Sequence, residues 1–173
     1  MSAHHPGLPI RIELLDRKRH DRVGFSCGVS ALDAYLQRQA AQDMEKRAAV
    51  VYVAVMESPA IAGYYTLSQF SIELVRLPET VAKKLARYPV VSATLLGRLA
   101  VCSAFKGQRL GETLLYDALR RSLAQSAYIA SAGVVVDAKD KQAAAFYQRY
   151  GFSSIFGAEH RLILHMKDIQ QMF

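Results

Sequence analysis

Residues 95–119 are the stretch that most constrains how this chain folds. They begin as an apolar run of strand length, Leu95–Val101, pass through a polar turn that holds Lys106 and Gly107, and become helical from about Leu110. A strand, a basic turn with glycine and a helix together present free backbone N–H groups and the positive end of a helix dipole to an anion. The turn lacks the spacings of a P-loop and of a dinucleotide fingerprint, so those two phosphate-binding motifs are excluded here.

Length and composition predict one globular domain over residues 1–173, with a flexible lead-in at residues 1–9. The two cysteines, Cys27 and Cys102, are too few for a disulfide framework and have no metal-ligand spacing, as is typical of reduced thiols in a cytoplasmic protein. No apolar run approaches the ~20 residues that cross a bilayer. The first ten residues lack the apolar core of a signal peptide. We therefore expect a cytoplasmic protein with no membrane segment and no metal.

The charge balance favours an anionic partner. The chain has 22 Lys and Arg against 15 Asp and Glu, a formal net charge of +7. Such a charge is typical of proteins that bind nucleic acid, a nucleotide cofactor or an acidic protein, and it also serves solubility alone. The positive residues cluster at 17–22, 46–47, 83–87 and 120–121. These clusters are candidate contacts to a phosphate backbone, or simply solvated surface.

Hydrophobic periodicity predicts an α+β chain, a mixed sheet with flanking helices. Ser30 is expected to cap the first helix, and the helix at 109–124 to join two parallel strands. If these two strands separate at one end, the gap forms a slot for an extended ligand. The expected strands are 10–15, 50–56, 61–74, 93–102, 130–136 and 162–166, and the expected helices are 31–48, 79–87, 109–124 and 141–150.

Two segments resemble the GNAT N-acetyltransferases. One is Arg98-Leu99-Ala100-Val101 running into Gln108-Arg109-Leu110-Gly111, and the other is Phe146-Tyr147 followed by Gly151-Phe152. Their order and separation are similar to the acetyl-CoA motif and the late helix of that family. The resemblance implies the GNAT acyl-CoA N-acyltransferase fold, an acetyl-CoA-dependent enzyme and no metal.

A set of residues in the N-terminal half of the chain resembles a narrower group within this family. Phe25, Cys27-Gly28, Leu32-Asp33 and Tyr35-Leu36, followed by Gln42-Asp43 and by 63–68 (Gly-Tyr-Tyr-Thr-Leu-Ser), resemble the GNAT toxins of type II toxin–antitoxin modules. Such toxins acetylate the amino group of aminoacyl-tRNA and stop translation. The resemblance implies a tRNA substrate, a homodimer, and a ribbon-helix-helix antitoxin whose complex with the toxin binds operator DNA.

The resemblance also implies where acetyl-CoA binds. Backbone groups of Leu99 and Val101 would pair with the pantetheine arm, and the turn 106–111 would hold the diphosphate. Arg109 stands where glycine is usual, Thr113 where Gly or Ala is usual, and Cys102 where Asp is frequent. Only glycine takes a positive φ at low cost, whereas an arginine adds a charge-assisted contact to phosphate. The implied cofactor-binding residues are Leu99, Ala100, Val101, Lys106, Gly107, Gln108, Arg109, Leu110, Gly111, Glu112 and Thr113.

Tyr147 is the catalytic residue that the resemblance implies, as proton donor to the departing CoA thiolate. A phenol stays protonated at neutral pH, which suits it to that role. The alternative is a packing role in the core. Helical spacing alone does not favour Tyr147 over Tyr150, since only Tyr150 shares a face with Phe146.

The acceptor site is less defined. Tyr64 and Tyr65 either line it or pack within the sheet, and Arg98 either meets an RNA phosphate or pairs with an acid. The candidate substrate-binding residues are Arg98, Tyr64, Tyr65, Lys83, Lys84 and Arg87. Two competing functions remain open: acetylation of a small-molecule or protein amine, and nucleic-acid binding without catalysis.

Overall fold

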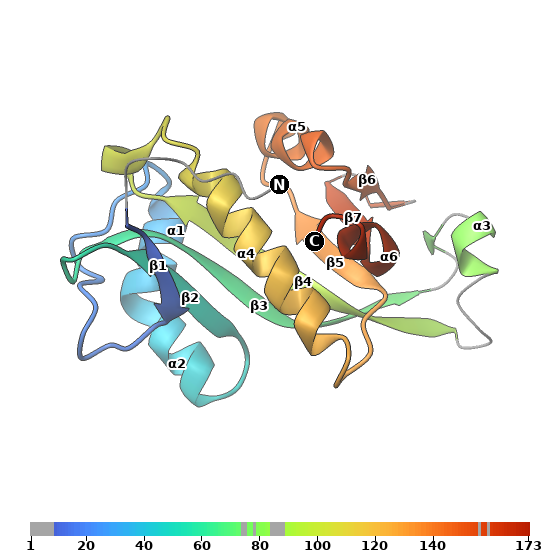
Figure 1. Ribbon diagram of the computed structural model, residues 1–173, viewed down its shortest axis with the longest axis horizontal. Helices are drawn as coiled ribbons and strands as arrows, with labels where there is room; N and C mark the ends of the chain where they lie inside the picture. The colour runs from blue at the N-terminus through green and yellow to red at the C-terminus, as the bar shows by residue number, and fades with distance from the viewer. Residues whose placement is uncertain (1–8, 74–75, 78, 84–88, 156, 159) are drawn as a thin grey trace. The chain divides into compact units, whose positions relative to one another are not determined.

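A computed structural model describes residues 9–73, 76–77, 79–83, 89–155, 157–158 and 160–173. Seven strands form one sheet in the order β1-β2-β3-β4-β5-β7-β6, and Figure 1 labels the elements along the chain. The strands are β1 (Arg11–Leu14), β2 (Val50–Val55), β3 (Ile61–Glu73), β4 (Val90–Val101), β5 (Gly133–Asp137), β6 (Ser153–Ser154) and β7 (Arg161–His165). The helices are α1 (Ser30–Ala34), α2 (Ala40–Glu45), α3 (Glu79–Ala82), α4 (Leu110–Gln125), α5 (Lys141–Arg149) and α6 (Met166–Gln170).

The chain divides into two compact units. Unit 1 comprises Met1–Thr66 and Arg98–Asp117, and unit 2 comprises Leu67–Gly97 and Ala118–Phe173. The expectation of a single domain stays a prediction, and the lead-in at 1–9 lies outside the described residues except for Pro9. None of the helices in the described ranges is long and apolar enough to cross a membrane.

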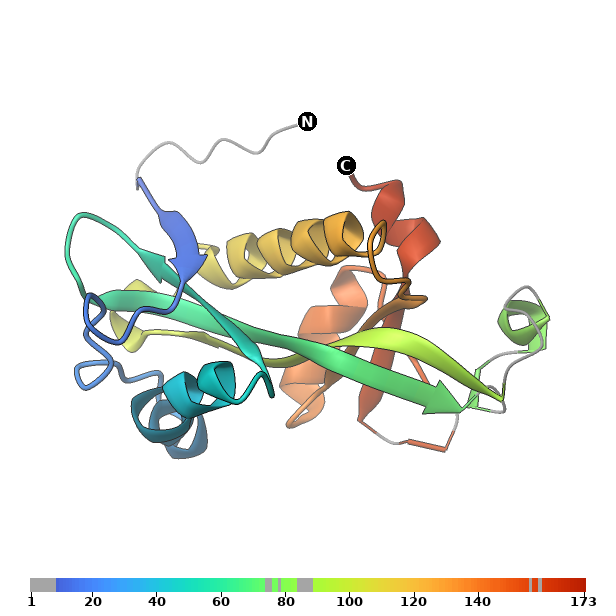
Figure 2. The ribbon, with the colours of Figure 1, turned by 90° about the horizontal axis from the view of Figure 1, so that it is seen from below.

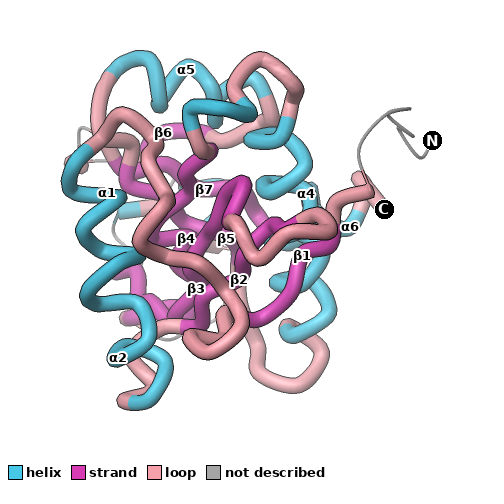
Figure 3. The backbone as a smooth tube through the Cα atoms, turned by 90° about the vertical axis from the view of Figure 1, so that its left-hand side faces the viewer, coloured by secondary structure: helices cyan, strands magenta, loops and turns pink. Residues whose placement is uncertain are grey.

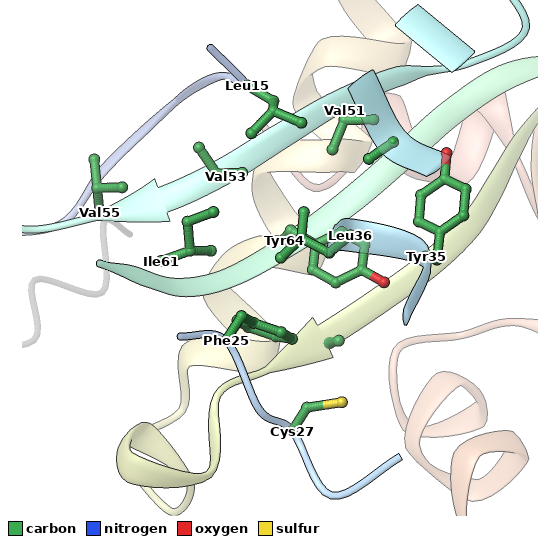
Figure 4. Close-up of a cluster of buried hydrophobic side chains, with 12 residues drawn as sticks. Leu15, Phe25, Cys27, Tyr35, Leu36, Val51, Val53, Val55, Ile61 and Tyr64 are labelled. Atoms are coloured by element: carbon green, nitrogen blue, oxygen red, sulfur yellow. The ribbon is translucent and has the colours of Figure 1, made fainter. Parts of the chain in front are cut away.

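Unit 1 has helices on both faces of its strands. β1 pairs with β2 in antiparallel register, from Arg11 opposite Val55 to Leu14 opposite Tyr52. In Figures 2 and 3, α1 and α2 lie along one face of β2 and the start of β3, and Figure 2 shows the first half of α4 on the other face. Burial of apolar side chains from both layers stabilises this arrangement. Figure 4 shows the core beneath α1 and α2, which includes Phe25, Tyr35, Leu36, Val51, Val53 and Tyr64.

The first helix differs from the sequence prediction of one helix over 31–48. It is α-helical over α1, π-helical over Tyr35–Gln39 and α-helical again over α2. The predicted cap by Ser30 is wrong: Ser30 is the first helical residue, and the N-cap Val29 makes no side-chain cap. Instead the Asp33 carboxylate accepts a hydrogen bond from the Cys27 amide, at 2.8 Å. Tyr35, the first residue of the π segment, is buried by tertiary contacts, which local propensity does not encode.

Unit 2 is built around β5, whose Val134, Val135 and Val136 are fully buried. β4 runs parallel to β5, with Thr94 opposite Val134 and Leu96 opposite Val136, which confirms the predicted parallel pair. β7 pairs with β5 in antiparallel register over the whole of both strands. Gly133 is required where β5 starts, because a Cβ there would lie 2.5 Å from the Leu164 carbonyl oxygen.

Most predicted elements occur within a few residues of their expected bounds. The strand expected at 130–136 begins at Gly133, and Met166, expected in the last strand, begins α6 instead. β6 and α6 were not predicted, since β6 has only two residues and α6 has five. Of the helix expected at 79–87, α3 is described, whereas residues 84–87 lie outside the described part.

Gly63 allows β3 to pack closely in unit 1, and its replacement tests that contact. A Cβ at Gly63 would lie 2.9 Å from the Ala100 carbonyl oxygen and 2.8 Å from Leu114 Cδ1. Because backbone cannot move aside cheaply, Gly63→Ala is expected to lower the free energy of unfolding by about 1–3 kcal/mol in urea titrations. Gln42→Ala, on an exposed helical position, is the control and should change it by less than about 0.5 kcal/mol. Equal stability of the two variants would contradict the packing described.

Candidate active site

The turn between β4 and α4 has two residues in the left-handed region. After the short 3-10 segment Ser103–Phe105, Gly107 has φ +80° and Arg109 has φ +59°. Arg109 and Arg47 are the two non-glycine residues with positive φ in the described part of the chain. Left-handed backbone costs an arginine roughly 1–2 kcal/mol. The turn therefore has the conformation that glycine would favour at 109, although an arginine occupies it.

The N-terminus of α4 leaves backbone donors available. Arg109 supplies the carbonyl that accepts hydrogen bonds from the Thr113 amide and the Thr113 hydroxyl, each at 3.1 Å. The amides of Leu110, Gly111 and Glu112 precede that first helical bond, so they have no partner inside the helix. α4 continues for 16 residues, and its dipole adds positive potential at this end. Residues 106–109 are all exposed, so an anion in solution reaches the turn.

Lys106 connects this turn by a hydrogen bond to the loop that precedes α1. Its ammonium donates a 2.6 Å hydrogen bond to the Cys27 carbonyl, and the Ser103 amide donates to the Ser26 carbonyl at 2.8 Å. Gly28, at φ +86°, lies beside this contact, because a Cβ there would be 3.5 Å from Lys106 Nζ. Of the three ammonium donors, one is thus engaged in positioning the loop.

The last residues of β4 extend beyond its register with β5. That register runs from Thr94 to Leu96, whereas β4 continues to Val101. Ala100 is buried in the core of unit 1, while Leu99 and Val101 are half-buried. The end of β4 therefore lies near the surface of unit 1, where its residues are only partly buried. The predicted slot between the two strands stays a prediction.

Tyr147 lies in α5 of unit 2, which is capped by the Asp140 carboxylate accepting from the Ala143 amide at 2.8 Å. Its ring is 8% exposed and packs against Phe146 and Phe152, with centroids 5.1 and 5.4 Å away. Among the described residues its hydroxyl has no hydrogen-bond partner. Burial raises the pKa of the Tyr147 phenol above its usual value, which keeps it protonated.

The two strand tyrosines lie in the core of unit 1. Tyr64 and Tyr65 are fully buried; the Tyr64 hydroxyl donates to the Leu32 carbonyl at 2.7 Å, and the Tyr65 hydroxyl to the Asp117 carboxylate at 2.6 Å. This placement favours the packing role over the lining of an acceptor site, the alternative that the sequence left open.

Several basic candidates already have acidic partners. Arg17 pairs with Glu45 at 3.0 Å, Arg19 pairs with Glu13 at 3.1 Å, and exposed Lys83 pairs with Glu79 at 3.2 Å. Lys84 and Arg87 lie outside the described residues. Arg98 differs, because its guanidinium carbon lies 3.5 Å from the centroid of the Tyr35 ring. Within the described ranges no cluster of three metal-binding side chains occurs.

Residues 47–154 match the profile of the Acetyltransferase (GNAT) domain. The chain belongs to the GNAT acetyltransferase family. The match covers β2 through β6 and so includes the strand–turn–helix segment and the helix with Tyr147. Both the family and the fold expected from the sequence are confirmed, as is the expectation of an acetyltransferase.

Two curated relatives are toxins. The chain is 26% identical over 169 residues to a probable toxin TacT of Sinorhizobium fredii, covering 93% of each chain. It is 29% identical over 152 residues to a tRNA-acetylating toxin of Mycobacterium tuberculosis, covering 88% of this chain and 90% of the relative.

Solved structures of similar toxins share the fold. A tyrosine-to-phenylalanine variant of KacT has a TM-score of 0.89 at 30% identity, over 95% of this chain and 99% of that one. AtaT complexed with acetyl-methionyl-tRNAfMet has a TM-score of 0.88 at 28% identity, with the same coverage. A tyrosine-to-phenylalanine variant of AtaT, bound to the C-terminus of the antitoxin AtaR and to acetyl-CoA, has a TM-score of 0.81 at 25% identity, over 95% and 98%.

Replacing Arg109 tests the strain in the turn. Arg109→Gly removes the cost of a side chain at φ +59°, so the free energy of unfolding is expected to rise by about 0.5–1 kcal/mol. Arg109→Ala keeps the Cβ and is the control, with stability equal to or below that of the parent chain. Chemical denaturation of the three proteins measures the difference. If glycine destabilises the protein as alanine does, residue 109 is not left-handed in solution.

Proposed function

We propose that this enzyme transfers the acetyl group of acetyl-CoA to the α-amino group of an aminoacyl-tRNA and thereby blocks translation. The observation that carries the choice of substrate is the similarity to AtaT complexed with acetyl-methionyl-tRNAfMet, which extends over 95% of this chain. The tRNA-acetylating toxin of Mycobacterium tuberculosis supports the same choice. The net charge of +7 suits a polyanionic acceptor.

The turn of unit 1 fits the diphosphate of acetyl-CoA. It offers three helix-terminal amides with no partner in the helix, the positive dipole end of α4, and the exposed Arg109. We expect residues 106–111 to bind the diphosphate, with Glu112 and Thr113 in the same helical turn, and the backbone of Leu99 and Val101 to bind the pantetheine arm. Acetyl-CoA, when bound, supplies a thioester from which an amine takes the acetyl group.

Tyr147 would act as general acid toward the sulfur. Its apolar surroundings keep the phenol neutral, and its hydroxyl is free to donate because no described residue accepts from it. The amine needs little assistance, since an α-amino group titrates near ~8 and an adjacent ester lowers that value further. A tyrosine acid without a dedicated base is therefore chemically sufficient.

Partners and location follow from the same proposal. The AtaT structure that holds the C-terminus of AtaR supports an antitoxin whose tail binds this chain. We expect a ribbon-helix-helix antitoxin, operator-DNA binding by the complex, a homodimeric toxin and a cytoplasmic location, where tRNA is present. The basic clusters at 17–22, 46–47, 83–87 and 120–121 are the proposed contacts to the tRNA backbone, since the exposed ion pairs of Arg17, Arg19 and Lys83 are weak enough to be exchanged for contacts with phosphate.

Transfer of radiolabelled acetyl groups to charged and uncharged tRNA tests the substrate. Label is expected on aminoacyl-tRNA only and should be lost on mild alkaline hydrolysis of the ester. Label on free amines or on protein lysines, but not on charged tRNA, would identify a different GNAT acceptor. Tight tRNA binding with no transfer at all would favour a non-catalytic protein.

Tyr147→Phe tests the general acid. Removing the hydroxyl is expected to lower kcat for acetyl transfer by about 10²–10⁴-fold, because no other donor would replace it. The affinity for acetyl-CoA, measured by calorimetry, should stay within about threefold. Tyr150→Phe is the matched control and should retain activity. Growth arrest on expression should disappear with Tyr147→Phe and persist with Tyr150→Phe.

The pH dependence of kcat tests the state of Tyr147. Because burial raises the pKa of this phenol, the acid form persists as the pH rises, and kcat should not decline between about pH 7 and about pH 9. Stopped-flow measurement at saturating substrates provides the profile. A decline across this range that disappears in Tyr147→Phe would show that the phenol ionises too readily.

A further inference from the structure

Arg98 combines partial burial with unused hydrogen-bonding capacity. It lies on β4 between core positions, and its guanidinium stacks 3.5 Å from the Tyr35 ring centroid. No described residue forms an ion pair or hydrogen bond with it, so its five N–H donors are not used within the described part of the chain. A half-buried guanidinium without a carboxylate partner is uncommon, since removal of a charge from water is costly when nothing offsets it.

Tyr35 is itself held rigidly. Its hydroxyl donates to the Asp43 carboxylate at 2.8 Å, and its ring stacks on Tyr64 with centroids 6.3 Å apart. The side-chain amide of Gln39 donates a hydrogen bond to the other Asp43 carboxylate oxygen at 2.9 Å. These contacts depend on the π-helical segment 35–39, which places Tyr35 and Asp43 within reach of each other. Arg98 therefore rests on a fixed aromatic surface.

Asp43 does not neutralise Arg98 by contact. The hydrogen bond from Gln39 lowers the pKa of Asp43, and the bond from Tyr35 and the charge of Arg98 act in the same direction. No ion pair within 4.0 Å joins the two residues, however. Asp43 accepts from Tyr35 and Gln39 and thus fixes the ring instead. Of the two roles left open by the sequence, the structure disfavours pairing with an acid.

Arg98 lies next to the part of β4 that is proposed to bind acetyl-CoA. It directly precedes Leu99, whose backbone is the proposed partner of the pantetheine arm. Side chains alternate along a strand, so Arg98 and Ala100 share the face that α1 and α2 cover, where Ala100 packs in the same core as Tyr35. An anion held by Arg98 would thus lie beside the end of the strand that receives the acetyl donor.

Resting on the proposed function, we propose that Arg98 binds a backbone phosphate of the single-stranded 3′ end of the aminoacyl-tRNA and so positions the amine. A planar guanidinium fixed on an aromatic ring binds phosphate through two parallel hydrogen bonds with little loss of side-chain entropy. The phosphates of the last nucleotides are the anions nearest the aminoacyl ester. Arg98 is therefore a positioning residue that distinguishes aminoacyl-tRNA from phosphate-free amines.

The experiment compares Arg98→Met with the parent chain on three acceptors that carry the same aminoacyl group: aminoacyl-tRNA, the aminoacyl-CCA trinucleotide and aminoacyl-adenosine. The last retains ester, amine and nucleoside but has no phosphate. Loss of a charge-assisted bidentate contact is expected to lower kcat/KM about 10- to 100-fold for the first two acceptors and less than about threefold for the third. The affinity for acetyl-CoA should not change.

Arg38→Met is the matched control, because Arg38 is an exposed arginine of the same π-helical segment and loses the same charge. It should retain nearly the parent kcat/KM on all three acceptors. The slope of log K against log salt for binding of the labelled CCA trinucleotide should weaken by about 0.7 in Arg98→Met, as for one phosphate contact to a single strand. Arg98→Lys, which keeps the charge but lacks the planar guanidinium, should recover only part of the loss.

Several outcomes would overturn the proposal. Equal losses on all three acceptors would assign Arg98 a structural role, and equal losses in Arg38→Met would indicate diffuse electrostatics. Loss of antitoxin-peptide binding with unchanged RNA kinetics would assign it to the protein partner. If the parent chain acetylates no charged tRNA, the proposed function is wrong. Binding of the CCA trinucleotide then tests Arg98 separately. A salt slope that is unchanged in Arg98→Met would show that Arg98 does not bind a phosphate.

Discussion

The close approach of backbones at Gly63 is the constraint on which the geometry of unit 1 depends. With no Cβ at that position, β3 lies against the Ala100 carbonyl of β4 and the Leu114 side chain of α4. The first half of α4 is thereby placed close to the strands, and the amides at its N-terminus are placed relative to the end of β4. The turn between them holds residue 109 in the left-handed region even though it is not glycine, a strain that the surrounding structure must offset.

The sequence predicts the strand–turn–helix segment and the parallel strand pair because both depend on local signals, an apolar run and a glycine-containing turn followed by helical spacing. It does not predict the π-helical segment, because the contacts of Tyr35 with Asp43 and Arg98 join distant residues. The cap assigned to Ser30 was wrong for a related reason. Asp33 satisfies the backbone of the preceding loop, and helix-capping statistics do not describe that contact.

In the candidate site, too, features set by local sequence could be predicted, whereas features set by tertiary contacts could not. A positive φ at Arg109 could be suspected from the family pattern, and the structure confirms it. The role of Arg98 could not be settled from alternation along the strand, since only the folded chain shows that none of the described acidic residues pairs with it. Likewise, the sequence shows Arg17 and Arg19 only as members of a basic cluster and does not show that each forms an ion pair with a glutamate. Net charge therefore overstates the number of cations without an acidic partner.

The π-helical turn also affects how relatives are compared. A π turn holds about one residue more than an α turn, so α2 is rotated relative to the direction that α1 alone would give it. A helical wheel drawn through 30–45 with uniform spacing assigns the wrong face to every residue after Gln39. Alignments of such chains should place their gaps within 35–39, because a single-residue deletion there restores continuous α-helix and leaves the residues on either side on the faces that they occupy here.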